Sequence, residues 1–222
     1  MSNENETDRR TSLHDLAVHY VTDKISSIGH DYIPGYTDLF ESKRTSVRTM
    51  IEIGIGLGAH HELMLVLHPD YRIGNCLKMW RDYFPCAHIY GLDIIECPPE
   101  LSNESRITTF IADQSSVTDL SRVMSSIVDE QNTIDVIIDD GSHFLDHQVT
   151  SFMFLSKYLS TNGGIYVIED VQAPHIESFQ TLEVFPEDFR EYIRDHFEVR
   201  WYDTRLNTGI SDDFLMVFLR KS

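Results

Sequence analysis

The stretch Met50-Ile-Glu-Ile-Gly-Ile-Gly-Leu-Gly58 decides the fold predicted for this chain. Its isoleucines suit a buried strand whose two faces are both covered by helices, as in a parallel sheet. The glycines that follow allow a sharp turn and let a ligand approach bare backbone. A glycine-rich turn after the first strand is where open α/β sheets bind nucleotides. Because Gly-x-Gly-x-Gly also occurs in ordinary loops, the pattern needs support from the rest of the chain.

The length and composition predict a single domain. With 222 residues, 41% of them apolar, the chain suits a sheet of about six or seven strands with helices on both faces. No apolar run reaches the length of a membrane span. The polar residues 1–12 are unlike a signal peptide and are expected to be a disordered lead-in. One domain is then expected over residues 13–222, beginning with a helical segment over residues 13–45 that lies near the site.

The charge and the cysteines restrict the partners and the compartment. A net charge of −18 argues against nucleic acid, whose phosphates require Lys and Arg, and no segment suggests a membrane partner. Acidic surfaces mostly serve solubility, so the charge alone does not establish a cation site. Cys76, Cys86 and Cys97 have no metal-ligand spacing, which predicts reduced thiols and a cytoplasmic protein.

The apolar pattern predicts five parallel strands and a C-terminal hairpin. After the first strand, buried strands are expected over residues 88–94, 107–112, 134–138 and 165–168. Residues 197–202 and 214–219 alternate apolar and polar side chains, and Asn207-Thr-Gly209 lies between them. These two runs are expected to form an antiparallel hairpin that closes one edge of the sheet.

Helices are expected before the first strand and between the strands. Two helix starts carry a hydroxyl N-cap with an acid three residues later: Ser12 with Asp15 and Ser116 with Asp119. Residues 59–67 can form a helix after the glycines. Another early helix, with Tyr32 and Tyr36, is expected to break near Pro34-Gly35. Its aromatic residues are expected in the core, with a flap over the site as the alternative.

Each predicted strand from the second to the fifth ends in a carboxylate. These acids are Asp93, Asp113, Asp139 with Asp140, and Glu169 with Asp170. The carboxyl ends of parallel strands share one edge of the sheet with the glycine turn, so the acids should gather there. The first two suit the hydroxyl and amine groups of a nucleoside.

The later acids predict a cation. Several carboxylates close together repel each other unless a cation or bound protons relieve them. Oxygen ligands without a nearby cysteine favour Mg²⁺. The alternative is that these acids cap the following helices. Because adjacent strand residues point to opposite faces, Glu169 and Asp170 can both bind an ion only if the strand has already ended.

Two histidines follow the fourth strand. His143 lies three residues beyond Asp140, and His147 lies one helical turn later. Such a pair can bind zinc, but the motif lacks a Glu partner. A histidine beside a metal-bound substrate is better interpreted as a general base, because its usual pKa of about 6.5 suits proton removal at neutral pH. For His147 we favour an exposed capping role.

The spacing to Asp93 argues against a dehydrogenase. A dinucleotide fold places its ribose-binding acid about 20 residues beyond the glycines. Asp93 lies 35 residues after Gly58, and residues 69–85 resemble an insertion beside the pocket. Hydride transfer also has no need for a cluster of carboxylates.

These residues resemble the class I S-adenosylmethionine-dependent methyltransferases. The resemblance is narrower to the metal-dependent O-methyltransferases that act on deoxysugars of macrolide antibiotics. It covers roughly residues 20–172 and rests on Glu52-Ile-Gly-Ile-Gly56, residues 80–85 and 89–94, Asp139-Asp-Gly-Ser-His143 and Ile168-Glu-Asp170. The early Thr22-Asp-Lys24, with His30, Tyr32 and Tyr36, is similar to the N-terminal segment of that group. Larger relatives carry a long N-terminal domain without a counterpart in these 222 residues, and Ala59-His60-His61 has no place in the pattern.

The resemblance implies a Rossmann-like class I methyltransferase fold, with a mostly parallel seven-stranded sheet and a C-terminal antiparallel hairpin. It also assigns roles to positions of this chain. Glu52, Gly54 and Gly56 would hold the methionine part of S-adenosylmethionine, Asp93 the ribose, and Asp113 and Gln114 the adenine. Asp140, Glu169 and Asp170 would bind Mg²⁺, and His143 would be the base. His30, Tyr32, Tyr36 and Trp80 would contact the substrate.

The implied reaction is methylation of a sugar hydroxyl in a small molecule. Mg²⁺ would lower the pKa of the hydroxyl, and His143 would take its proton. Relatives of this kind often form dimers or tetramers, so the resemblance also allows a homo-oligomer. The alternatives are an N-methyltransferase or catechol O-methyltransferase of the same fold, a nicotinamide-dependent oxidoreductase, and a binding module without catalysis.

Overall fold

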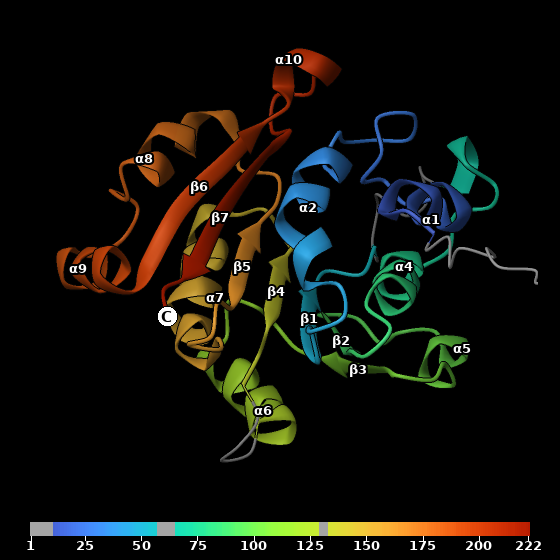
Figure 1. The fold of residues 1–222 in the computed structure, drawn as a ribbon, viewed down its shortest axis with the longest axis horizontal. Helices are drawn as coiled ribbons and strands as arrows, with labels where there is room; N and C mark the ends of the chain where they lie inside the picture. The colour runs from blue at the N-terminus through green and yellow to red at the C-terminus, as the bar shows by residue number, and fades with distance from the viewer. Residues whose placement is uncertain (1–10, 57–64, 129–132) are drawn as a thin grey trace, which may run out of the picture.

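One seven-stranded sheet organises the protein (Figure 1). The structure is a computed structural model that describes residues 11–56, 65–128 and 133–222. The strands lie in the order β3-β2-β1-β4-β5-β7-β6. They are β1 Thr49–Ile53, β2 His88–Asp93, β3 Ile107–Ile111, β4 Val136–Asp139, β5 Ile165–Ile168, β6 Phe197–Asp203 and β7 Phe214–Arg220.

The strand pairing confirms the predicted parallel sheet and hairpin. Strands β1 to β5 pair in parallel, whereas β7 is antiparallel to both β5 and β6. The hairpin does not simply extend the sheet, because β7 inserts between β5 and β6. Its loop contains the short helix α10 (Arg205–Thr208), which ends at Gly209 in the left-handed conformation. The fourth strand begins at Val136, because Ile134 makes only an isolated bridge to Leu159.

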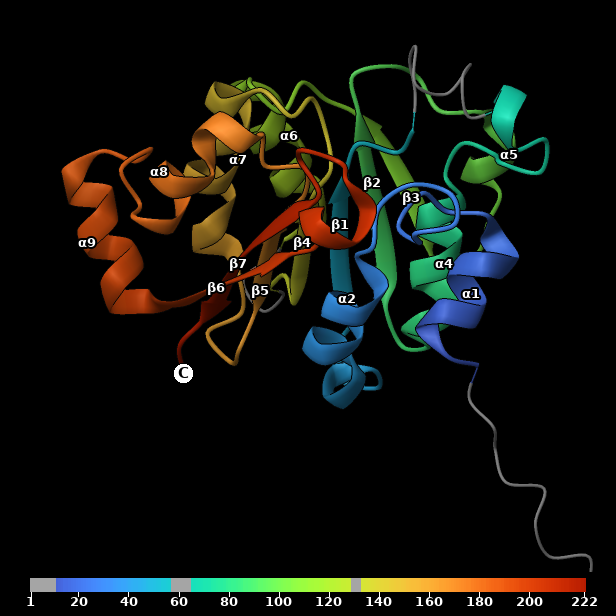
Figure 2. The ribbon, with the colours of Figure 1, turned by 90° about the horizontal axis from the view of Figure 1, so that it is seen from above.

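Helices cover both faces of the sheet (Figure 2). Helices α1, α2 and α4 lie on one face, and α6 and α7 lie on the other, while α8 and α9 lie beside β7 and β6. Buried apolar residues form one cluster on each side. The helices are α1 Leu13–Tyr20, α2 Ile33–Phe40, α4 Asn75–Tyr83, α5 Pro99–Ser102, α6 Val117–Ile127, α7 Leu145–Leu155, α8 Ile176–Gln180 and α9 Glu187–His196. No helix in the described ranges has the length and apolar character that crossing a membrane would require.

The N-terminal helices differ from the expectation in one respect. Helix α2 is unbroken, so the predicted break near Pro34-Gly35 is wrong. Pro34 lies in the first turn, where the backbone N–H that proline lacks has no partner within the helix anyway. The predicted N-caps are confirmed, since Ser12 and Ser116 accept hydrogen bonds from the backbone N–H of Asp15 and Asp119. Tyr32 and Tyr36 are fully buried in the core.

The glycine turn after the first strand packs against the backbone at the end of the fourth strand. Gly54 has a φ of +82°, and a Cβ atom there would lie 1.9 Å from the backbone oxygen of Asp140. Only glycine permits this approach, which brings the turn beside the loop after β4. The helix predicted over residues 59–67 lies mostly outside the described residues. Residues 1–10 of the predicted lead-in over residues 1–12, and the pair His60 and His61, lie outside them as well.

Candidate active site

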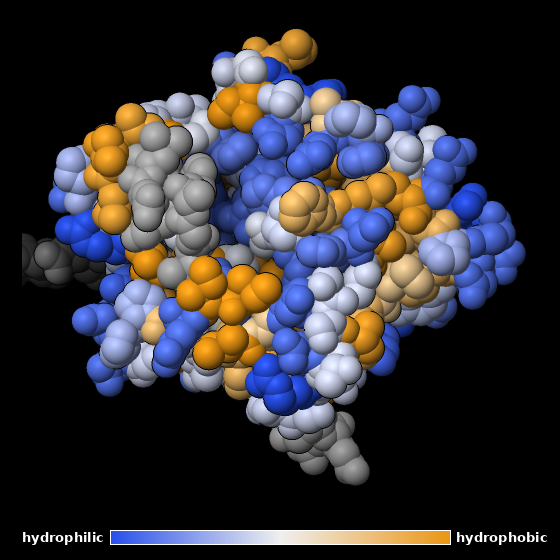
Figure 3. Space-filling view, turned by 180° about the vertical axis from the view of Figure 1, so that it is seen from behind, coloured by the Kyte–Doolittle hydropathy of each residue, from blue (hydrophilic) through white to orange (hydrophobic). Residues whose placement is uncertain are grey.

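A cavity of about 400 Å³ lies at the carboxyl ends of the parallel strands. Its volume is within the range of about 300–1,000 Å³ usual for small-molecule sites. The glycine turn and the loops after β2, β3, β4 and β5 all contribute lining residues. Ile94 and Phe144 also line it and are 64% and 63% exposed, which gives it apolar groups open to solvent. The face shown in Figure 3 is mostly hydrophilic, with apolar patches beside a hollow.

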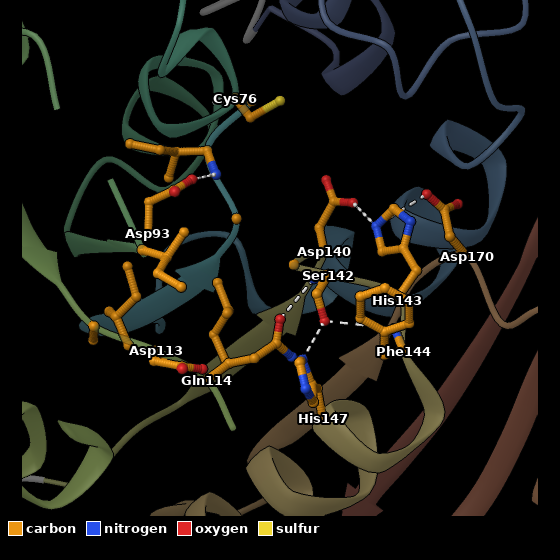
Figure 4. Close-up of a pocket in the computed structure, with 18 of the residues that line it drawn as sticks. Cys76, Asp93, Asp113, Gln114, Asp140, Ser142, His143, Phe144, His147 and Asp170 are labelled. Atoms are coloured by element: carbon orange, nitrogen blue, oxygen red, sulfur yellow. Dashed lines mark hydrogen bonds and ion pairs between the residues drawn. The ribbon is translucent and has the colours of Figure 1, made fainter. Parts of the chain in front are cut away.

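Asp93 and Asp113 lie together on one side of this cavity (Figure 4). Asp93 accepts hydrogen bonds from the backbone N–H groups of Ile55 and Ile95, at 3.1 and 3.2 Å. It thereby ties the end of β2 to the glycine turn. Asp113 accepts from the backbone N–H and the hydroxyl of Ser115, and these bonds lower the pKa of its carboxyl. Asp113 is therefore an ionised acceptor at neutral pH, and both side chains can accept hydrogen bonds from the hydroxyl or amine groups of a ligand.

Gln114 lines the cavity but uses both ends of its amide within the protein. Its Nε2 donates to Asp139 at 2.9 Å, and its Oε1 accepts from the backbone N–H of Ser142 at 2.7 Å. Gly141 makes this packing possible, because a Cβ atom there would lie 1.9 Å from the Gln114 Oε1. In this geometry Gln114 fixes the turn that carries His143.

Glu52 is buried beneath the glycine turn. Its Oε1 accepts a hydrogen bond from the Trp80 indole at 3.2 Å and lies 3.5 Å from the Lys24 ammonium. Its Oε2 is buried and has no hydrogen-bond partner among the described residues. Burial raises the pKa of Glu52 to about 7, although Lys24 opposes the rise. Glu52 is not one of the residues that line the cavity as the described chain encloses it.

Asp140, His143 and Asp170 meet on the other side of the cavity (Figure 4). The His143 Nε2 lies 3.3 Å from the Asp140 Oδ1 and 3.4 Å from the Asp170 Oδ2. One ligand atom from each of the three lies within 4.8 Å of the others, which is compact enough to surround a metal ion. His143 and Asp170 have φ values of +57° and +53°. Non-glycine residues are rarely found there, and such strain is concentrated at functional sites.

Glu169 belongs to the same cluster but faces a different partner. Strand β5 ends at Ile168, so Glu169 and Asp170 both lie beyond the regular strand, as joint binding of an ion would require. The Asp170 carboxylate faces His143, whereas both Glu169 oxygens accept from the Lys24 ammonium, at 2.8 and 2.9 Å. The same ammonium donates to the Asp140 Oδ2 at 2.7 Å. In this geometry Asp140 and Asp170 can share an ion at once, but Glu169 cannot join them while Lys24 holds it.

The electrostatics of the cluster are those of a charged, buried site. Burial lowers the pKa of His143, but the attraction of Asp140 and Asp170 outweighs burial and raises this pKa to about 10. Lys24 and His143 together hold the pKa of Asp140 below its usual value against burial. Burial and the charge of Asp140 raise the pKa of Asp170 to about 6. His143 is therefore protonated at neutral pH while the two acids are free, and it can accept a proton only when their charge is neutralised.

The residues predicted to contact the substrate divide into two groups. Tyr32, Tyr36 and Trp80 are fully buried behind the acids and, as the described residues enclose it, do not line the cavity. Their polar atoms donate to Asp170, Glu169 and Glu52, respectively. They can position these acids but cannot touch a ligand in the cavity. His30 does line the cavity, so it alone of the four can meet a substrate.

Asp213, at the end of the loop before β7, was not identified from the sequence. It is fully buried, and its Oδ1 lies 3.6 Å from the His30 Nδ1, which also lies 3.4 Å from Asp170. Asp213 is far along the chain from every motif, and no local pattern indicates that it reaches the site.

The second histidine after β4 has a separate role. The His147 Nδ1 lies 2.8 Å from the Ser142 hydroxyl and does not join the group formed by Asp140, His143 and Asp170. His147 therefore pairs with Ser142 instead of completing a metal site with His143. Cys76, Cys86 and Cys97 are all free, as expected.

Several characterised enzymes are similar to this chain in sequence. A demethylmacrocin O-methyltransferase from Streptomyces fradiae is 34% identical over 173 residues, which are 78% of this chain and 40% of that enzyme. A mycinamicin VI 2''-O-methyltransferase from Micromonospora griseorubida is 34% identical over 171 residues, 77% of this chain and 39% of the enzyme. A tetracenomycin-C rhamnosyl 3'-O-methyltransferase from Streptomyces olivaceus is 37% identical over 165 residues, 74% of this chain and 38% of the enzyme. The chain thus spans about two fifths of the length of these relatives. No model of a protein family matches the chain.

Solved structures give the same picture of the fold. The MycE methyltransferase of mycinamycin biosynthesis, in complex with Mg, SAH and mycinamycin VI, superposes with a TM-score of 0.71 at 24% identity. That match covers 96% of this chain and 54% of MycE. A second MycE structure, with Mg and SAH, gives a TM-score of 0.69 at 26% identity over 96% of this chain and 56% of MycE.

Proposed function

We infer that this chain, a relative of the sugar O-methyltransferases with the class I methyltransferase fold, is itself an S-adenosylmethionine-dependent and Mg²⁺-dependent O-methyltransferase. Its acceptor is a hydroxyl group of a sugar in a glycosylated small molecule. The single observation that carries the inference is the meeting of Asp140, His143 and Asp170 at the edge of the cavity that Asp93 and Asp113 also line. Residues suited to a nucleoside and residues suited to a cation therefore line the same cavity.

The cofactor would occupy the half formed by the glycine turn, Asp93 and Asp113. Gly54 and Gly56 line the cavity and leave backbone open to a ligand. Asp93 lies beside them and would accept from the ribose hydroxyls. Asp113 would face the adenine, with Gln114 beneath it. Glu52 lies buried under the turn, where it would support the backbone that holds the methionine part of the cofactor.

The metal would bind to Asp140, Glu169 and Asp170. The donor set fits Mg²⁺, because all three ligands are carboxylates of the kind this ion prefers. Bound there, Mg²⁺ supplies a Lewis acid that lowers the pKa of a sugar hydroxyl.

His143 would then act as the base. Once the charge of Asp140 and Asp170 is neutralised, the interactions that raise its pKa disappear, and the imidazole can take a proton. His143 would take the proton of the acceptor hydroxyl, and bound S-adenosylmethionine would supply the methyl group to that oxygen. His30, which lies beside Asp170 and lines the same cavity, would position the acceptor.

Methyl transfer to a panel of acceptors tests this proposal. With labelled S-adenosylmethionine and Mg²⁺, we expect methylation of deoxysugar glycosides and none of catechols or amines. Methylation of catechols or amines alone would instead assign a catechol O-methyltransferase or an N-methyltransferase. Binding of NAD without binding of S-adenosylhomocysteine would contradict the methyltransferase function altogether.

The remaining partners follow from the same features. We propose a cytoplasmic enzyme of small-molecule metabolism, supported by its three free cysteines. The net charge of −18 disfavours nucleic acid as a partner. A homo-oligomer is the arrangement expected from related enzymes.

A further inference from the structure

A lysine from the loop between α1 and α2 lies within the acid cluster. The side chain of Lys24 is only 1% exposed, and its ammonium lies near one carboxylate within β1 and two that follow β4 and β5. It lies 2.7 Å from Asp140, 2.8 Å from Glu169 and 3.5 Å from Glu52. Although burial opposes it, the charges of Asp140 and Glu169 raise the pKa of Lys24 well above its usual value. The ammonium is therefore a permanent charge inside the site.

Lys24 and a divalent cation compete for the same carboxylates. The ammonium holds both oxygens of Glu169 and the Oδ2 of Asp140. If Glu169 is to bind an ion together with Asp140 and Asp170, the Lys24 ammonium must release Glu169. An ammonium and a metal ion on the same carboxylates would repel each other strongly in a buried site. The Tyr36 hydroxyl also donates to Glu169, so the carboxylate keeps one fixed partner while Lys24 moves.

Glu52 offers the released ammonium a new partner. Its Oε1 is already 3.5 Å from the Lys24 Nζ. Its Oε2 is fully buried and has no hydrogen-bond partner in the described chain. An unpaired buried carboxylate oxygen is costly, so a nearby donor without another acceptor would be drawn to it.

We propose that Lys24 is the exchangeable counter-ion of the metal site. It neutralises Asp140 and Glu169 before a divalent cation binds, and it moves to Glu52 when the cation takes these two acids. This inference rests on the proposed function, because it assumes that the acids bind a metal. Lys24 is a positioning residue and touches neither the acceptor nor the methyl group. Its charge sets how tightly the site holds its ion.

Calorimetric titration with Mg²⁺, without cofactor and at pH 8, tests the exchange. At this pH Glu52 is ionised in the folded protein, since its pKa is about 7. Lys24→Met removes the competing charge, so Mg²⁺ should bind more tightly, by a factor within the range of about 5–150 typical of coupled binding events. Glu52→Gln removes the charged acceptor for the displaced ammonium, so Mg²⁺ should bind more weakly. If Lys24 served only folding, Lys24→Met would not tighten Mg²⁺ binding and Glu52→Gln would not weaken it.

Lys78→Met is the matched control. Lys78 also pairs with a carboxylate, Glu104 at 3.2 Å, but it does not line the cavity that the described residues form. Arg81 also bonds to Glu104, so the control leaves no carboxylate unpaired. Its affinity for Mg²⁺ should equal that of the wild type.

The outcomes separate the inference from the function on which it rests. Unchanged or weaker binding by Lys24→Met overturns the counter-ion role, and unchanged or tighter binding by Glu52→Gln overturns the transfer to Glu52. If Lys24→Met does not fold, Glu52→Gln decides by itself. If the wild type binds no Mg²⁺, the proposed metal site is overturned as well. The same follows if the Asp170→Asn variant binds Mg²⁺ as tightly as the wild type does.

Discussion

The two halves of the cavity satisfy their carboxylates in different ways. In the cofactor half, formed by the glycine turn, Asp93 and Asp113, the acids accept hydrogen bonds from backbone N–H groups two residues away. In the acid half, formed by Asp140, His143, Glu169 and Asp170, the partners are side chains. Lys24 is 116 residues from Asp140 and 145 residues from Glu169.

This difference separates a preformed site from one that depends on bound charge. The acids of the cofactor half are held by the backbone, so they are ready whether or not a ligand is present. The acids of the acid half lie against each other in a buried place, where only cationic groups relieve their repulsion. The acid half should therefore respond to metal, pH and charge mutations far more strongly than the cofactor half.

Metal removal should produce the largest difference between the two halves of the cavity. Exhaustive chelation with EDTA should abolish methyl transfer, and Mg²⁺ should restore it, because the hydroxyl loses the Lewis acid that lowers its pKa. The affinity for S-adenosylhomocysteine, measured by calorimetry, should remain nearly unchanged. Full activity after chelation would show that the acids only cap the following helices.

Replacing His143 should remove the base and leave the affinities for S-adenosylhomocysteine and Mg²⁺ nearly unchanged. His143→Ala should lower kcat by about 10²–10⁴-fold, the usual contribution of a general base. The wild-type kcat/KM should fall as the pH drops through the pKa of this histidine, and the mutant should lack that limb. His19→Ala, an exposed position on α1, is the control and should keep the wild-type rate. A His143→Ala enzyme with the wild-type rate and pH profile would assign proton removal to water.

The pH should change the stability of the acid half when no metal is bound. Glu52 has a folded pKa of about 7 against a usual value of 4.5, so its contribution to stability is full below pH 4.5 and is lost as the pH rises through 7. At about 1.4 kcal/mol per pKa unit, the loss is on the order of 3 kcal/mol. The pKa of Asp170 is raised from its usual 3.8 to about 6, so this group adds to the loss of stability over that pH range.

Urea unfolding in EDTA at pH 5 and pH 8 measures this change. Glu52→Gln cannot titrate, so its free energy of unfolding should fall less over the same range. A wild type that becomes more stable from pH 5 to pH 8 would mean that the buried acids are ionised and fully compensated.

Asp93→Ala should have the smallest effect of the four and should be confined to the cofactor half. Loss of hydrogen bonds to a charged group should weaken the binding of S-adenosylhomocysteine by about 1.5–3 kcal/mol. The affinity for Mg²⁺ should not change, because Asp93 makes no contact with the acid half. Equal binding of S-adenosylhomocysteine by the mutant would remove Asp93 from the cofactor site.

The sequence predicted the fold and the edge of the sheet where the acids gather, because both depend on local signals. Apolar runs, turn glycines and N-caps are visible within a few residues, and they placed the seven strands and the edge where the acids gather. The parallel arrangement then required Asp93, Asp113, Asp140 and Asp170 to meet, whatever the details of packing.

The acid half was less predictable because its geometry is tertiary. Thr22-Asp-Lys24 belongs to the stretch that is similar to the sugar O-methyltransferases, but nothing local indicates that Lys24 would hold Glu169. Tyr32 and Tyr36 lie in the core, as the helix pattern predicts, and only their hydroxyls reach the acids. The substrate contact that the resemblance implies for them is absent from the geometry of the described residues. Asp213 lies on a loop that approaches the site only because β7 pairs beside β5.

A crystal structure with S-adenosylhomocysteine and Mn²⁺ tests the central claim most directly, because anomalous scattering identifies Mn²⁺ by its element. The account predicts an anomalous peak bound by Asp140, Glu169 and Asp170, with S-adenosylhomocysteine in the half beside Asp93. It also predicts that the Glu169 carboxylate is released from Lys24. An acid half without an anomalous peak, with Lys24 still bound to Glu169 while S-adenosylhomocysteine is in place, would contradict it.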